Sequence, residues 1–557
     1  MAAVRRMSAG SEQWNRLLRE EADRRAFLRK AAFAGTGALL SSTWVGHAKE
    51  RGDEIPELQL AVDWEGGGPP LDLTRGPATA YQFYSLSVAL EGLLHLDEHA
   101  RLQPRLAESW SNPDPRTYVF KLRRGVTFWD GSPLTAQDVV YAFTRHADRQ
   151  WASNFAWFFP QQYESIEIPA ADEVVFRLKE PNVYFAAAAG MTASYVVKAS
   201  FAEAHRRDLG TASVLTMGTG PYRITRYAAN DRIELVRNER YWGEKPLLRR
   251  IVLRAVEDGN SQLLALRAGE IDGSMSVPKA AVPRWKRTPG IGVVTFPSAR
   301  CWWSAFDREV KPLDDIHVRR ALAHALDREG LKHVLFRGRA RLAQAFAPPE
   351  TWSQLLPPQE IEALYAELPH NPYDLDRARE ELAQSSVPGG FELTVPVEAL
   401  PDSEKIMQVW QAGLARIGVR LHLESVSRDE YRSRFFRRTR PVGIFITEWG
   451  TEFPDPLWNA VSTVRSEQAV AGAWNLSNLK SPVIDSLLAR CQSTPDPALR
   501  GPLARELTRR LAEDCGFYPL FWPDESIAFD RRKVEVDDFK WWAVFSPIWT
   551  SFLRPPA

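Results

Sequence analysis

The feature that most constrains the fold is the way two hydrophobic periodicities alternate along the chain after residue 50. Residues 116–131 alternate apolar and polar side chains and then turn at Asp130–Gly131, which predicts a β-hairpin. The apolar positions are Tyr118, Phe120 and Leu122. Residues 135–148 change to helical spacing, with Thr135 and Asp138 as a capping box. Strand and helix segments continue to alternate toward the C-terminus, so the sequence predicts an α/β fold with mixed sheets.

Two later segments show the same alternation. Residues 314–331 carry apolar side chains at three- and four-residue spacing, which predicts a helix that begins at Asp314 or Asp315. Residues 403–426 predict a helix that stops at Gly418 and is followed by a strand.

The first 48 residues have the composition of an export signal. Arg24 and Arg25 precede a weakly apolar stretch that ends in small residues near Ala48 and is too short to span a bilayer. The segment resembles a twin-arginine signal, and no cysteine lies near it that would carry a lipid anchor. The alternative is an amphipathic N-terminal helix that stays on the chain. No other segment reaches 18 apolar residues, so we expect a soluble periplasmic protein after removal of residues 1–48.

Charge and cysteine content exclude two classes of function. Residues 1–48 hold eight Lys or Arg and four Asp or Glu, which leaves 63 basic and 66 acidic residues in the rest of the chain. Such a body lacks the basic surplus of a nucleic-acid-binding protein. The three cysteines form no CxxC pair, so a zinc ribbon or redox dithiol is not expected, and the sequence leaves open whether Cys491 and Cys515 are bridged.

The sequence contains few patterns that indicate catalysis. It has no G-x-S-x-G elbow, no P-loop and no dinucleotide-binding G-x-G-x-x-G. Residues 95–99 match the H-x-x-E-H pattern of some zinc peptidases, which would need His95 and His99 on one helical face. Because Asp97–Glu98 is typical of a hairpin turn, we expect an exposed turn there. We predict a protein that is not an enzyme and binds no metal or cofactor.

Several segments together resemble one family. They are residues 102–145, 218–246, 265–274, 313–331 and 371–382, in that order. All five are similar to the extracellular solute-binding proteins of family 5, which serve oligopeptide and dipeptide ABC transporters.

The resemblance implies a two-lobed periplasmic-binding-protein fold of type II with an extra inserted domain and a hinge between the lobes. It places a discontinuous first lobe at 52–84, 217–303 and 523–557, the inserted domain at 85–216 and the second lobe at 304–522. Two connections, near residues 303 and 522, would form the hinge, and closure would bury the ligand between the lobes.

The resemblance also places a candidate ligand anchor in WGTEFPDP, residues 449–456. Glu452 falls where peptide-binding relatives carry an aspartate that pairs with the peptide ammonium, so the carboxylate is kept with one more methylene. A carboxylate in a closed cleft favours an amine partner; the alternative is a solvated loop acid. Trp449 would form the adjacent wall, and we include Asp455, which the flanking prolines are expected to expose on a turn.

Five more aromatic residues and an arginine-rich run are further candidates for ligand contact. Tyr81, Phe83 and Tyr84 match the ligand-contacting loop of the family, and Trp302 and Trp303 lie at the predicted hinge, where they either stack on a ligand or pack the crossing. An arginine-rich run offers Arg437, Arg438 or Arg440 to a ligand carboxylate, with a solvated basic edge as the alternative.

The sequence therefore predicts the substrate-binding component of a peptide-type ABC transporter. Its expected partners are short peptides and the permease subunits, with no nucleic acid, and it is expected to be a monomer. The alternative is the same fold binding oligosaccharides or another solute, because 20 tryptophans offer flat surfaces on which sugars stack.

Overall fold

A computed structural model describes residues 54–64, 68–75, 79–147, 153, 155, 158–440, 442–451, 453–536 and 538–556. The chain separates into two compact units, Met1–Gly52 and Asp53–Ala557. The predicted export signal falls in the first unit, outside the described residues, and stays a prediction. The described residues all belong to the second unit.

One large sheet contains strands from both halves of the second unit. Its order is β17-β13-β18-β11-β1-β10-β9-β8, and β12 and β14 also pair with β18. The strands are β1 (Leu58–Val62), β8 (Tyr222–Ala228), β9 (Arg232–Arg237), β10 (Arg250–Ala255), β11 (Gly273–Ser274), β12 (Ile291–Pro297), β13 (Arg300–Phe306), β14 (Ala340–Leu342), β17 (Ile444–Gly450) and β18 (Phe517–Asp530). β1 runs parallel to β10 and β11, which gives the mixed sheet that the sequence predicts.

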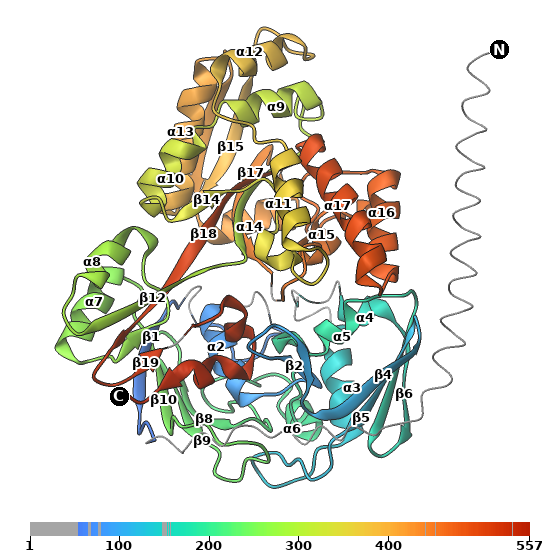
Figure 1. Cartoon of the computed structure of the whole chain (residues 1–557), viewed down its shortest axis with the longest axis vertical. Helices are drawn as coiled ribbons and strands as arrows, with labels where there is room; N and C mark the ends of the chain where they lie inside the picture. Colours follow the sequence, from blue (N-terminus) through green and yellow to red (C-terminus); the bar gives the residue numbers. More distant parts are fainter. Residues whose placement is uncertain are drawn as a thin grey trace. The chain divides into compact units, whose positions relative to one another are not determined.

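The long strand β18 joins two lobes (Figure 1). Its first half pairs with β13 and β14, and its second half, from Asp524 onward, pairs with β11 and β12. Pro523 stands at the change of partners, where a residue without a backbone N–H is tolerated. We call the β1, β8–β12 side the first lobe and the β13–β17 side the second lobe.

A second connection lies beside the first. β12 ends at Pro297 and β13 begins at Arg300, so this crossing is a few residues earlier than the sequence predicts. Trp302 and Trp303 lie just beyond it, in the second-lobe sheet, with a register shift between them. The two-lobed fold is confirmed, whereas the proposed domain boundaries stay a prediction.

A separate four-stranded sheet, ordered β4-β5-β7-β6, lies within the predicted inserted domain. Its strands are β4 (Ala107–Asp114), β5 (Thr117–Leu122), β6 (Tyr163–Ala170) and β7 (Glu173–Leu178). The alternating residues Tyr118, Phe120 and Leu122 are buried in β5 as predicted. The predicted hairpin of this strand through Asp130–Gly131 is wrong, because β5 pairs with β4 and β7. The turn at Asp130–Gly131 is closed locally by the bridge Thr127–Pro133 and by Phe128 N, which donates to Ser132 O.

The helices and remaining strands of the first-lobe side, including the inserted segment, pack around these sheets. They are α2 (Ala80–Ala89), β2 (Leu94–Leu96), β3 (Leu102–Pro104), α3 (Ala136–Thr144), α4 (Phe159–Gln162), α5 (Phe185–Ala188), α6 (Ala199–Ala204), α7 (Gly259–Ala268) and α8 (Val282–Lys286). In α3 the capping box is confirmed: Thr135 accepts from Asp138 N, and the Asp138 carboxylate accepts from Thr135 N. Such a cap provides partners for the donors that a helix start leaves unpaired.

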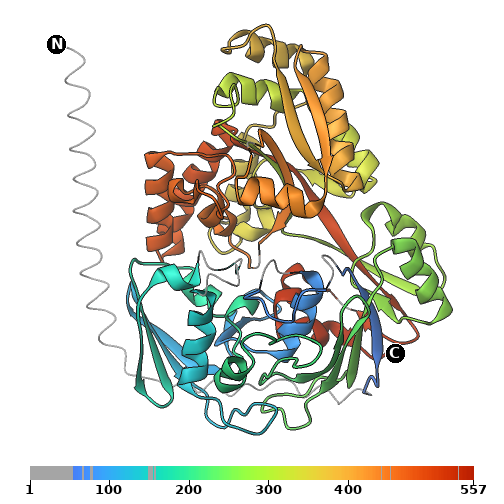
Figure 2. The ribbon, with the colours of Figure 1, turned by 180° about the vertical axis from the view of Figure 1, so that it is seen from behind.

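The second lobe packs helices around its strands (Figures 1 and 2). It contains α9 (Ile316–His324), α10 (Arg328–Phe336), α11 (Pro358–Glu367), α12 (Leu375–Ala383), β15 (Glu392–Glu398), α13 (Pro401–Ala415), β16 (Arg420–Val426), α14 (Arg428–Phe436), α15 (Trp458–Thr463), α16 (Pro482–Ser493) and α17 (Pro497–Asp514). Asp315 is the N-cap of α9, and Gly418, at φ 88°, separates α13 from β16, both as predicted. β15 and β16 are parallel.

The C-terminal segment returns to the first lobe and covers α2. It comprises β19 (Glu535–Val536), η8 (Trp541–Phe545), η9 (Pro547–Phe552) and β20 (Leu553–Arg554). Trp549 is buried and donates its indole N–H to Tyr84 O. Within the described part of the chain, no helix combines the length and the apolar composition needed to cross a membrane.

Candidate ligand-binding site

The end of β17 presents an aromatic surface. Strand alternation places Phe445 and Trp449 on the same face, and Trp449 is only partly buried. Its ring meets Trp474 edge-on, with centroids 4.0 Å apart, and Trp474 in turn meets Phe436 at 4.4 Å. We call Phe436, Trp449 and Trp474 the Trp449 cluster. All three rings are half-buried and pack edge-on against one another, so they form a rigid aromatic cluster that is partly open to solvent.

Glu452, the predicted anchor, lies outside the described residues. Its neighbours are ordered by a local contact, in which Thr451 Oγ1 donates to Phe453 O at 2.7 Å. Thr451 and Phe453 are both buried. The role of Glu452 therefore stays a prediction.

Asp455 is not exposed, so the expectation of a solvated turn acid is wrong. The side chain is buried at 6% exposure, and each of its oxygens has a protein partner. Oδ1 accepts from Leu457 N and from the Tyr184 hydroxyl, and Oδ2 pairs with Arg500 at 3.1 Å. Burial raises the pKa of Asp455 above its ordinary value although Arg500 opposes the shift.

Glu448 is a partly buried charge that sequence reasoning missed. It lies on the opposite face of β17 from Trp449, directly across from Trp302 on β13. Its carboxylate binds Lys279 Nζ at 3.0 Å and Arg300 Nη1 at 3.6 Å. Burial raises the pKa of Glu448, but the two cations outweigh burial and hold it below the ordinary value.

The Glu448–Lys279 pair joins the two lobes. Lys279 begins η5 (Lys279–Ala281) of the first lobe, whereas β17 belongs to the second. Arg300 also pairs with Glu525 of β18 at 3.1 Å, so charges line both crossing strands. The sequence did offer a signal. Glu448 follows the apolar Ile446 by two residues, which places it on the same face of a strand, and a charge on a buried face requires a partner.

The aromatic residues of α2 pack within the first lobe. Tyr81 is fully buried and stacks on Trp64 with centroids 4.1 Å apart, while its hydroxyl donates to Pro69 O. Tyr84 lies edge-on to Trp549, and the partly buried Phe83 lies edge-on to Phe545. The C-terminal segment thus supplies partners for these side chains that the sequence could not indicate. Their role as ligand contacts stays a prediction.

The two hinge tryptophans also pack. Trp303 is 1% exposed and contacts Phe346, Phe445 and Phe517. Trp302 is buried on the other face, opposite Glu448. The sequence left open whether these tryptophans pack at the connection between the lobes or stack on a ligand. The structure shows that they pack there, and stacking on a ligand stays a prediction.

The arginine-rich run divides into different environments. Arg437 and Arg440 are exposed, which fits the solvated edge. Arg438 donates to the side chain of Asn478 and to Asn475 O, so its guanidinium fixes the loop that carries Trp474. Arg437 therefore stays a prediction as a ligand contact.

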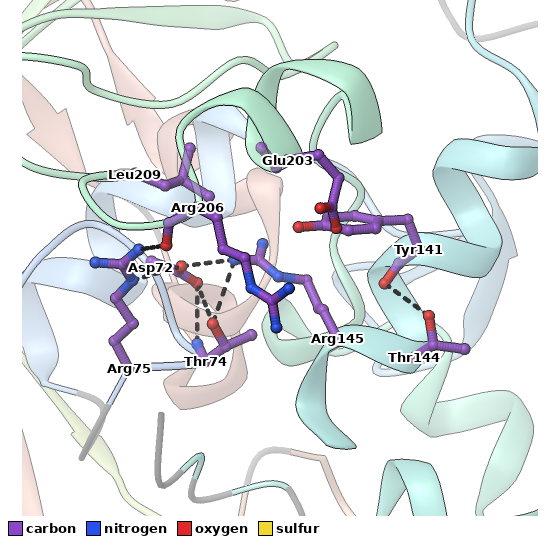
Figure 3. Close-up of a pocket in the computed structure, with 10 residues that line it drawn as sticks. Asp72, Thr74, Arg75, Tyr141, Thr144, Arg145, Glu203, Arg206 and Leu209 are labelled. Atoms are coloured by element: carbon purple, nitrogen blue, oxygen red, sulfur yellow. Dashed lines mark hydrogen bonds and ion pairs between the residues drawn. The ribbon is translucent and has the colours of Figure 1, made fainter. Parts of the chain in front are cut away.

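A pocket of about 210 Å³ lies elsewhere. Figure 3 shows it between the loop after β1, α3 and the turn after α6, where Asp72 accepts from Arg145 at 2.6 Å. Arg75 donates to the carbonyl oxygens of Arg206 and Arg207. The residues that line it include none of the candidates named from the sequence. Its charged groups hold the loop after β1 against the inserted segment.

The zinc-peptidase alternative finds no support in the geometry. His95 lies on strand β2 and His99 in the turn that joins β2 to β3, as the hairpin interpretation predicts. Among the described residues, no group of His, Cys, Asp and Glu side chains could hold a metal ion. Cys301, Cys491 and Cys515 are free and buried, so Cys491 and Cys515 form no disulfide in this structure.

Comparison with known proteins agrees with this architecture. Residues 101–469 match the model of the bacterial extracellular solute-binding proteins, family 5. The chain belongs to this family. The function predicted from the sequence, solute binding for a peptide-type ABC transporter, is confirmed at the level of the family.

Individual relatives differ in what they bind. The heme-binding protein A of Haemophilus influenzae is 26% identical over 411 residues, 70% of this chain and 73% of that protein. The glutathione-binding protein GsiB of Escherichia coli K12 is 25% identical over 488 residues, 83% of this chain and 91% of that protein. The periplasmic binding protein DppA of Helicobacter pylori, solved with the peptide STSA, superposes with a TM-score of 0.77 at 22% identity, covering 90% of this chain and 98% of that one.

Proposed function

We propose that this protein captures short peptides with a free amino terminus between its two lobes and delivers them to an ABC permease. The observation that carries the proposal is the position of the Trp449 cluster. It stands at the end of β17, beside β13, which begins just after the second connection between the lobes, and three residues before Glu452 in the sequence. A ligand there contacts the second lobe, and it favours closure if it also contacts the first.

Glu452 supplies the charge in this proposal. A carboxylate binds an ammonium group by a charge-assisted hydrogen bond, and peptide amino termini carry that group at neutral pH. The same proposal includes a periplasmic, monomeric, non-enzymatic protein, with residues 1–48 removed on export, which fits a family of extracellular proteins.

The oligosaccharide alternative loses its main argument in the structure. It rested on the 20 tryptophans, but Trp64, Trp285, Trp303, Trp352, Trp410 and Trp549 are among the most deeply buried side chains of the chain. These residues build the cores of the lobes rather than a sugar-binding surface. The half-buried tryptophans, which include Trp449 and Trp474 as well as Trp110, Trp129, Trp242, Trp541 and Trp542, are the part of that argument that remains.

Calorimetry on variants tests the anchor. Glu452→Gln should weaken binding of a tri- to pentapeptide pool roughly 10- to 100-fold, because a charge-assisted contact in the closed site is lost. Glu467→Gln is the matched control, since Glu467 is an exposed acid of the same lobe that pairs with Arg465. Equal affinity of both variants for the pool would contradict the role of Glu452.

A further inference from the structure

Asp455 receives donors from the second lobe and from the inserted segment on the first-lobe side. Leu457 N and Arg500 belong to the second lobe, whereas Tyr184 follows β7 of the four-stranded sheet. The Tyr184 hydroxyl donates to Asp455 Oδ1 at 3.1 Å. This bond therefore ties residues 453–456, which follow Glu452 in the sequence, to the inserted segment.

The ring of Tyr184 is fixed by contacts around that bond. It is 1% exposed and packs against Phe453 and Trp458, and the Arg500 guanidinium lies over its face at 5.7 Å. Its own backbone N–H donates to Asn182 Oδ1, which sets the turn before α5.

A backbone bond next to Tyr184 makes the same connection. Val183 N donates to Gln492 O of α16 at 2.8 Å. Figures 1 and 2 show α16 and α17 extending down toward α4 and α5 in both views. The contact is thus a built interface between the 182–185 turn and the second lobe.

The Tyr184 hydroxyl stabilises the buried carboxylate of Asp455. Asp455 is a buried carboxylate, and a buried carboxylate that loses a donor keeps its desolvation penalty without the compensating bond. The Tyr184–Asp455 bond exists only while the two lobes hold this relative position. It therefore stabilises this lobe arrangement over any in which the 182–185 turn and the stretch 449–456 have separated.

We propose that Tyr184 is a positioning residue for ligand binding: through Asp455 it holds the stretch 449–456 against the first-lobe side and favours the arrangement of the lobes that retains ligand. The proposal rests on the proposed function, because the ligand it retains is the peptide captured beside Trp449. When the competent arrangement is less populated, apparent affinity falls by the same factor.

Tyr184→Phe removes the hydroxyl and keeps the ring. Tyr222→Phe is the matched control, because Tyr222 is also fully buried and its hydroxyl donates to Leu248 O at 2.7 Å within the first lobe. We expect Tyr184→Phe to bind the peptide pool about tenfold more weakly, the size of one hydrogen bond to a charged group. Small-angle scattering of the unliganded protein should show a larger radius of gyration. Tyr222→Phe should lower the melting temperature and change neither affinity nor radius.

The outcomes separate this proposal from the proposed function. If the wild-type protein binds no peptide, the proposed function fails and the unliganded radius alone decides the role of Tyr184. A radius that increases only in Tyr184→Phe supports the proposal. Unchanged radius and affinity in Tyr184→Phe, or equal changes in both variants, overturn it.

Discussion

The ion pair between Lys279 and Glu448 should contribute measurably to the stability of the two-lobed unit. The two side chains are 23% and 17% exposed, and Nζ lies 3.0 Å from Oε1. Coulomb's law at an effective dielectric of about 20 gives an attraction of about 5 kcal/mol for charges this close. Desolvation of both groups removes most of that energy. We therefore expect a net coupling of about 1–2 kcal/mol.

A double-mutant cycle measures this coupling directly. Lys279→Ala, Glu448→Gln and the double variant are unfolded in urea at low salt, and the free energies of unfolding are compared. Lys279→Ala should be the milder single change, because Arg300 stays beside Glu448. The pair is partly shielded from solvent, so the coupling should persist in about 0.5 M NaCl. A coupling below about 0.3 kcal/mol would refute the reasoning and make the pair an ordinary surface contact.

Three further predictions concern stability and pH. Trp303→Ala empties a site among Phe346, Phe445 and Phe517 and should lower the free energy of unfolding by about 3–5 kcal/mol in urea titrations, whereas a loss under about 1 kcal/mol would contradict close packing there. Thr135→Ala removes the α3 cap and should lower the same quantity by about 1 kcal/mol, with Thr225→Ala, an exposed strand position, as the control; equal losses would refute a capping contribution. The two cations hold the pKa of folded Glu448 below its ordinary value of 4.5, so the ionised carboxylate adds to the free energy of unfolding. This contribution is fully present above pH 4.5 and is lost as the pH falls through the lower pKa of the folded state. Melting temperatures of the wild type should therefore fall more steeply below pH 4.5 than those of Glu448→Gln, and parallel curves would refute this assignment.

Local signals in the sequence predicted local structure well. The capping box of α3, the N-cap at Asp315 and the left-handed Gly418 all depend on residues a few positions apart, and all are confirmed. The alternation in β5 correctly identified its buried face. The hairpin predicted through Asp130–Gly131 was wrong, because a turn signal does not say which strands pair with β5.

The site depends on contacts between distant residues, which periodicity does not encode. Asp455 was expected to be exposed because its donors Tyr184 and Arg500 are far from it along the chain. Glu448 was missed because Lys279 lies 169 positions away. The switch of β18 from one lobe to the other likewise depends on four partner strands from separate parts of the sequence. Only resemblance to a family directed attention to the stretch 449–456.

The most direct test of the central claim is calorimetry of the wild-type protein, freed of residues 1–48, with three ligand pools. The pools are mixed tri- to pentapeptides, the same peptides with acetylated amino termini, and cello-oligosaccharides. Capture of peptides through their amino terminus predicts binding to the free-amine pool that acetylation abolishes. Binding that ignores acetylation, or that occurs only with the oligosaccharides, would contradict it.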